Sequence, residues 1–147
     1  MRKSSRLLIS LKLVIISVIS FFSEAQANNN QDGIIIEKLS ETAKSWDGVT
    51  YNRYPEGETQ LTTLKITIPP YTSLSWHEHP IPNVAYVLRG RLTVEKKDTG
   101  QKMSLSTGQV LPEMVNSAHR GYTGKEGTTL IVFYAGARGI PLSKPAD

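Results

Sequence analysis

The sequence feature that most constrains the fold is the alternation of apolar and polar side chains over residues 61–68. A period of two places every second side chain on one face, as in a β-strand with one buried side. The run stops at Pro69 and Pro70, because proline cannot donate to a strand ladder. Residues 84–94 and 128–134 are rich in β-branched and aromatic side chains, and turn-forming residues separate these segments. From residue 60 onward the chain therefore predicts an all-β domain, a sandwich or barrel of short strands.

The first 27 residues have the features of a secretory signal peptide. Four basic residues precede or border a largely apolar run at residues 13–22, and Ala25-Gln26-Ala27 supplies the small-residue cleavage pattern. A run of about ten residues is too short to span a bilayer, which needs about 20. We expect cleavage before Asn28 and a periplasmic or secreted protein with no stable membrane association. An uncleaved anchor is the alternative.

The charge of the chain changes when this segment is set aside. The whole chain has a formal net charge of +4, but residues 28–147 hold 13 Lys and Arg against 12 Asp and Glu. No basic cluster with interleaved aromatic residues is present, so we expect no nucleic-acid partner. The chain has no cysteine, which excludes disulfides and thiolate ligands. Any bound metal must therefore be held by nitrogen and oxygen atoms.

The mature chain reads as one folded domain behind a short extension. Residues 28–58 form the extension, with a short apolar strand at 34–37, and residues 59–140 form the domain. No internal repeat or linker indicates a second domain. About 120 residues are enough to fold alone.

The three histidines of the chain stand at metal-ligand spacing. His77 and His79 are two residues apart, and His119 follows 40 residues after His79. If residues 72–79 form a strand, His77 and His79 project from the same face. A single histidine of this kind is more often a partly buried, hydrogen-bonded residue, but here no histidine is left over. Imidazole and oxygen ligands favour one divalent transition metal, namely Fe, Mn, Ni, Cu or Zn.

Two motifs give the chain a resemblance to the cupin superfamily. The first cupin motif reads G-x5-H-x-H-x3,4-E-x6-G, and the segment HEHPIPNVAYVLRG reproduces its spacing from His77 to Gly90. The second reads G-x5-P-x-G-x2-H-x3-N, and GQVLPEMVNSAH matches its outer markers, Gly108 and His119. The resemblance covers roughly residues 61–136. It implies a single cupin jelly-roll β-barrel with a metal bound by His77, His79 and His119, and a homodimer, which small cupins commonly form.

The departures from these motifs bear on the ligand set. Four of them fall at turn or packing positions, namely Tyr71, Met114, Asn116 and Thr123. Asn83 stands where cupins usually supply a carboxylate to the metal, whereas Glu113 stands where an apolar, barrel-facing residue is usual. Both are candidates for additional ligands or for hydrogen-bond partners of the ligands, and Glu113 is the candidate catalytic residue. The alternative is that Pro112 turns Glu113 out to solvent.

Function is less constrained than fold, because this fold carries many unrelated activities. The leading hypothesis is an exported metal-dependent enzyme acting on a small molecule in the barrel, dioxygenase-like or of another small-molecule chemistry. The alternative is a non-catalytic module that binds a small solute or a metal. Trp76 is expected to pack against another strand or a second subunit, and Tyr134 to be a core aromatic residue.

Overall fold

The computed structural model describes residues 33–146, which contain eight β-strands and no helix. Their bounds, in chain order, are β1 Thr59–Ile68, β2 His77–Glu78, β3 Asn83–Lys96, β4 Lys102–Ser106, β5 Val110–Pro112, β6 His119–Tyr122, β7 Thr128–Ala137 and β8 Lys144–Pro145. The all-β prediction is confirmed. The strands expected at 61–68, 84–94 and 128–134 correspond to β1, β3 and β7.

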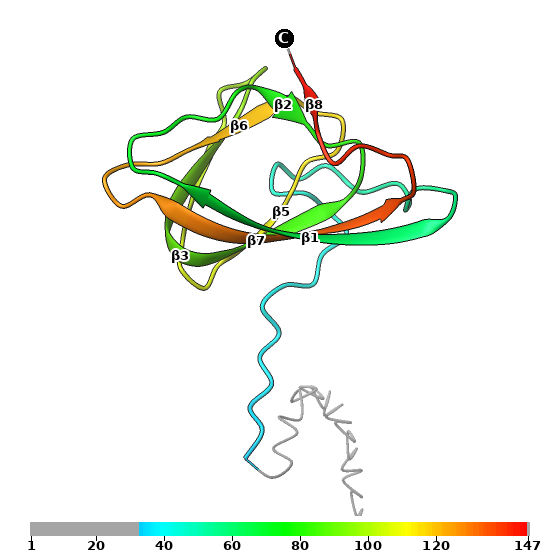
Figure 1. Ribbon diagram of the computed structural model, residues 1–147, viewed down its shortest axis with the longest axis horizontal. Helices are drawn as coiled ribbons and strands as arrows, with labels where there is room; N and C mark the ends of the chain where they lie inside the picture. The colour runs from blue at the N-terminus through cyan, green and yellow to red at the C-terminus, as the bar shows by residue number, and fades with distance from the viewer. Residues whose placement is uncertain (1–32, 147) are drawn as a thin grey trace, which may run out of the picture. The chain divides into compact units, whose positions relative to one another are not determined.

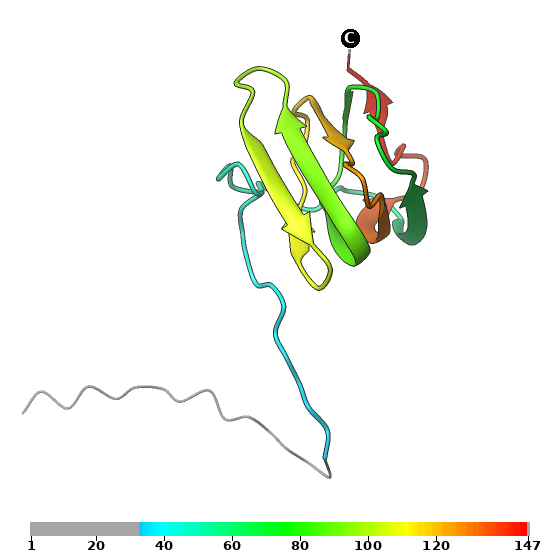
Figure 2. The same cartoon turned by 90° about the vertical axis from the view of Figure 1, so that its left-hand side faces the viewer.

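Every strand pairing is antiparallel, and β3 belongs to two sheets. Its first half pairs with β7 and β5, and β7 pairs with β1 at the edge. Its second half pairs with β4 and β6, and β6 continues through β2 to β8. Figure 1 shows β1 and β7 on one side of this unit and β6, β2 and β8 on the other. Figure 2, which is turned by 90° from Figure 1, shows the β3–β4 hairpin facing the viewer.

The bend in β3 depends on a bulge and a glycine. The register between β3 and β7 shifts between Val87 and Arg89, as at a β-bulge, which bends and twists a strand. Gly90 follows with φ of 85°, and a Cβ built there would lie 2.2 Å from the carbonyl oxygen of Gly127. Only glycine fits such a close backbone approach. The glycine that ends the first motif is therefore the residue that allows β3 to pass from one sheet to the other.

Two residues that replace motif glycines keep the backbone conformation that glycine favours. Tyr71 has φ of 54° and Asn116 has φ of 51°, and both lie in the left-handed region. Asparagine enters this region more readily than other residues, whereas a tyrosine there is strained. The NH of Asn116 donates to the carbonyl of His79 at 2.8 Å, so this turn is tied to a histidine.

The core lies on the inner faces of the two sheets. Its buried members are Ile68, Ile81, Ala85, Val87, Leu92, Val94, Leu105, Leu111, Leu130, Val132 and Tyr134. Along β3 the buried positions alternate from Asn83 to Val87 and resume at Leu92, as the bulge requires. The period of two seen in the sequence therefore has its expected cause, one face inside and one outside.

Two expected strands differ from the structure. Residues 34–37 form no strand, and the side chains of Ile34, Ile35 and Ile36 are exposed. The strand expected at 72–79 is reduced to His77–Glu78, because β2 has only the short partners β6 and β8 to pair with.

Segments on both sides of the domain expected at 59–140 contact its strands. Residues 45–51 hydrogen-bond to the end of β5, and β8 pairs with β2. The expected signal peptide, residues 1–27, lies outside the described residues. Within 33–146, no helix is long and apolar enough to cross a membrane.

Candidate metal centre

The three histidines converge from two neighbouring strands. His77 lies in β2, His79 follows directly after it, and His119 begins β6. Because β2 and β6 pair with His77 opposite His119, the two chain segments bring their imidazoles together. Each residue offers one ligand nitrogen, and these nitrogens all lie within 4.8 Å of one another. The three imidazoles therefore form a group of the kind that can hold one metal ion.

Backbone carbonyls fix the tautomer of every ring. Nδ1 of His77 contacts the carbonyl oxygen of Ser75 at 2.9 Å, and Nδ1 of His119 contacts that of Ser117 at 2.8 Å. Nδ1 of His79 contacts the carbonyl of Leu142, 63 residues away, at 2.7 Å. A carbonyl oxygen only accepts, so each Nδ1 donates a proton and each Nε2 keeps its lone pair. Metal-binding histidines are commonly oriented by such contacts.

Two of the histidines are buried and neutral. His79 and His119 are 5% and 1% exposed. Burial lowers the pKa of His79 to about 4, and burial likewise lowers the pKa of His119 to about 4. Removal of an imidazolium from water is costly, which explains the direction of both shifts. A neutral imidazole is the form that binds a metal ion, so no proton has to be displaced from these rings near pH 7.

Glu113 points toward the histidines. One carboxylate oxygen, Oε2, lies 3.4 Å from Nε2 of His119, and the Glu113 side chain is 10% exposed. The alternative in which Pro112 turns this side chain out to solvent is therefore not what the structure shows. Burial raises the pKa of Glu113 to about 8. Both Oε2 of Glu113 and Nε2 of His119 are buried without a hydrogen-bond partner in the described residues, which is the donor set that a cation would satisfy.

The backbone around Glu113 is held from both sides. Its NH donates to the carbonyl of Asn83 in β3 at 3.0 Å, and its carbonyl accepts the hydroxyl of Tyr51 at 2.6 Å. The NH of Trp46 donates to the carbonyl of Pro112, one residue earlier, at 2.9 Å. The segment that contains Trp46 and Tyr51 therefore positions the residue that carries the carboxylate.

Asn83 is buried beside this group but faces a different set of neighbours. It is 2% exposed, its amide nitrogen lies 3.4 Å from the carbonyl of Ile81, and its Oδ1 has no hydrogen-bond partner among residues 33–146. The cavity that contains the histidines and Glu113 is not lined by Asn83, which instead borders a second cavity with Tyr51 and Phe133. Of the two candidate additional ligands, Glu113 is the one that lies at the histidines.

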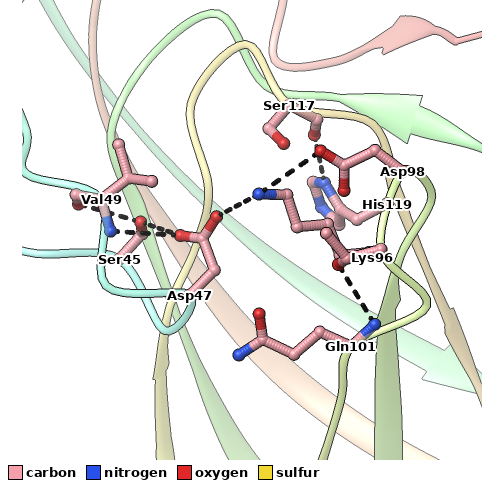
Figure 3. A network of polar contacts seen from close by, with 9 residues as sticks. Ser45, Asp47, Val49, Lys96, Asp98, Gln101, Ser117 and His119 are labelled. Carbon is pink, nitrogen blue, oxygen red and sulfur yellow. Dashed lines mark hydrogen bonds and ion pairs between the residues drawn. The ribbon is translucent and has the colours of Figure 1, made fainter.

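A buried ion pair ties the same N-terminal segment to the strand beside His119 (Figure 3). Oδ2 of Asp47 lies 2.9 Å from Nζ of Lys96, and the Asp47 side chain is 1% exposed. Oδ1 of Asp47 accepts the hydroxyl of Ser45 at 2.5 Å, which closes the turn. Lys96 is the register partner of His119 in the β3–β6 pair. The ion pair therefore anchors residues 45–49 next to the histidine cluster.

The histidines open into a cavity of about 450 Å³ inside the barrel. Side chains of β1, β3, β6 and β7 line it, together with residues 74–76 and the C-terminal residues 142–145. Tyr134 also lines it, with its ring centroid 5.7 Å from that of His79. Burial raises the pKa of Tyr134 to about 12, so its hydroxyl stays protonated. A cavity of this size is in the range of about 300–1,000 Å³ that small-molecule sites occupy.

Two solved structures have a similar fold. The DMSP lyase DddQ from Ruegeria pomeroyi matches with a TM-score of 0.52 and 15% identity, over 58% of this chain and 43% of its own chain. A Klebsiella pneumoniae protein with a double-stranded β-helix domain matches with a TM-score of 0.51 and 17% identity, over 66% of this chain and 91% of its own. The chain has the cupin fold. At these identities the likeness concerns the fold alone, and the matched part spans less than half of DddQ. No protein-family model matches the chain, and no curated protein matches it in sequence.

Several residues that shape the site have roles that the sequence did not indicate. Tyr134 is in the core, as expected, and it also lines the cavity; the alternation of buried positions along β7 places it inside. Trp76 borders the cavity and also stacks against Arg120, whose guanidinium carbon lies 4.4 Å from the ring centroid. Nothing in the sequence indicated that Leu142 orients His79.

Proposed function

We propose that this chain is an exported, metal-dependent cupin enzyme that transforms a small molecule inside the barrel. The observation that carries the proposal is the convergence of three imidazoles beside a buried carboxyl group and a cavity. Each imidazole donates a hydrogen bond from Nδ1 to a backbone carbonyl oxygen. A divalent transition ion bound there supplies Lewis-acid activation of a substrate oxygen or, when it is redox-active, the electron transfer of a dioxygenase-like reaction.

The four ligands of this proposal are the Nε2 atoms of His77, His79 and His119 and a carboxylate oxygen of Glu113. Three neutral imidazoles and one carboxylate favour Fe, Mn, Ni, Cu or Zn over Mg or Ca. The contacts at Nδ1 restrain the orientation of the rings and leave each Nε2 free to bind the ion. Asn83 is left out of this ligand set, because it does not line the cavity.

The remaining residues of the cavity position the substrate and exclude water. The apolar walls lower the local dielectric, which strengthens electrostatic contacts at the metal end. The hydroxyl of Tyr134 stays protonated to a pH of about 12 and is available to donate a hydrogen bond to a bound oxygen atom. Glu113 would contribute a negative charge once a bound cation displaces its proton, whereas the three imidazoles contribute none.

Elemental analysis of the mature protein, purified without chelators, tests the metal. We expect one transition-metal ion per chain, and none in the variant in which His77, His79 and His119 are all alanine, with circular dichroism of both proteins reporting an all-β fold. Stoichiometric metal in that variant would show that the site is elsewhere. A folded wild-type chain that takes up no transition metal would refute the proposal.

Turnover separates an enzyme from a non-catalytic module. The metal-loaded protein and its His119→Ala variant are incubated with a panel of small molecules, and substrate loss is followed by mass spectrometry. Loss that depends on metal and on His119 supports an enzyme. Saturable binding with no loss of any bound compound would instead support a solute-binding or metal-binding cupin.

A further inference from the structure

One side of the histidine cavity is lined by hydrocarbon side chains. They include Leu64 and Ile66 from β1 and Leu130 and Val132 from β7. β1 and β7 belong to the sheet opposite β6, β2 and β8. A buried hydroxyl of a ligand placed against such a wall finds no hydrogen-bond partner and costs about 1–3 kcal/mol to desolvate, as protein substitutions show.

Polar groups gather at the other end of the cavity. The three histidines and Glu113 lie there, and Ser75, Ser143 and Lys144 border the same space. A cation bound by the histidines favours a negatively charged oxygen on the ligand.

Resting on the proposed metal site, we propose that the ligand of this cavity has one anionic oxygen head and a hydrocarbon body. The head faces the histidines, and the body fills the apolar part of the cavity. Polyols, sugar acids and phosphate esters with many hydroxyls are disfavoured, because each hydroxyl on the body would lose its contacts with water. A site without polar partners should therefore bind such compounds more weakly than hydrocarbon compounds of equal size and charge.

Hexanoate and gluconate are matched probes for this difference. Both have six carbons and one carboxylate, but one body is hydrocarbon and the other carries hydroxyls. The protein is loaded with Co²⁺, and binding is followed through the visible spectrum of the cobalt ion. We expect hexanoate to bind at least about tenfold more tightly than gluconate, and each added methylene from butanoate to hexanoate to raise the affinity about three- to fourfold.

Two outcomes distinguish a failure of the proposed metal site from a failure of this inference. Failure of the folded protein to take up Co²⁺ refutes the proposed function and this inference with it. A protein that carries Co²⁺ but binds gluconate as tightly as hexanoate, or binds no hexanoate up to its solubility limit, overturns the inference and leaves the metal site standing.

A pair of valines on neighbouring strands provides the matched variants. Val132 of β7 lines the cavity and is 4% exposed, whereas Val84 of β3 does not line it and is 39% exposed. Val132→Thr keeps the shape of the side chain and adds a hydroxyl to the wall. We expect it to weaken hexanoate binding by about fivefold or more with Co²⁺ loading unchanged, and Val84→Thr to change neither. Equal hexanoate affinity in Val132→Thr and wild type would overturn the assignment of this wall to the hydrocarbon body.

Discussion

Replacement of Glu113 by glutamine should have opposite effects on the metal-free and the metal-bound protein. In the metal-free protein, burial raises the pKa of Glu113 from 4.5 to about 8. Its folded form therefore holds a proton that the unfolded chain releases above pH 4.5. An acid with a raised pKa contributes most to stability below pH 4.5, and its contribution falls as the pH rises toward 8.

The magnitude follows from that shift. Each pH unit above 4.5 costs about 1.4 kcal/mol, so by pH 7 the buried carboxyl costs the metal-free protein about 3 kcal/mol. Glutamine has a similar shape and no titration, so Glu113→Gln should raise the free energy of unfolding of the metal-free protein by up to about 3 kcal/mol at pH 7. The gain should vanish at pH 4.5. With metal present, loss of the carboxylate should weaken metal affinity by about 10–100-fold.

Urea unfolding in the presence of a chelator, at pH 4.5 and pH 7, measures the first effect, and competition with a metal-binding dye measures the second. Glu78→Gln is the control, because Glu78 lies between two of the histidines in sequence but does not line their cavity. The reasoning is refuted if metal-free Glu113→Gln is less stable than wild type at pH 7. It is also refuted if both variants bind metal as wild type does.

Four further predictions use other parts of the chain. Burial lowers the pKa of His79 and His119 to about 4, so between pH 6.5 and 4 the unfolded chain binds protons that the folded protein does not. Metal-free Glu113→Gln should therefore lose stability as the pH falls over that range, and thermal melts check it. Tyr71→Gly should raise the free energy of unfolding by about 0.5–1 kcal/mol, since it relieves a left-handed tyrosine that is 81% exposed, and a lower melting temperature would contradict this. The N-terminus recovered from the native host should lie at or near Asn28, whereas an intact N-terminus in membranes would favour an anchor. Light scattering should show a homodimer at micromolar concentrations, and replacement of the exposed Ile34–Ile36 by serines should weaken it.

The long strands could be predicted because their cause is local. β1, β3 and β7 each have enough alternating or β-branched residues to reveal one buried face. The short strands β2 and β8 have two residues each and exist only through their pairing with each other and with β6. Strand formation of that kind depends on tertiary context, which no window of the sequence contains. The same argument explains why apolar residues 34–37 look like a strand and form none.

The candidate site could likewise be predicted only in part. The spacing of His77, His79 and His119 was visible in the sequence, and the structure brings all three together. The groups that orient them were not visible, because a backbone carbonyl leaves no trace in residue identity. Two of these carbonyls belong to residues two positions earlier, but the third, from Leu142, arrives from the far end of the chain. The hydrogen bond from the Tyr51 hydroxyl to the Glu113 carbonyl likewise joins residues 62 positions apart.

Taken together, the departures at Asn83 and Glu113 place a carboxyl group directly after β5 instead of at the start of β3. The NH of Glu113 donates to the carbonyl of Asn83, so the two backbones are direct neighbours, about 4.8 Å apart as paired strands are. The carboxyl group of Glu113 lies at the histidine cluster, 3.4 Å from Nε2 of His119, and approaches it from the β5 side. That approach requires the backbone at residue 113 to be fixed, and the hydroxyl of Tyr51 fixes it. In the proposed metal centre a bound cation would displace the proton that burial favours on Glu113, so three imidazoles and one carboxylate would have the ligand charge of the motif without a contribution from Asn83.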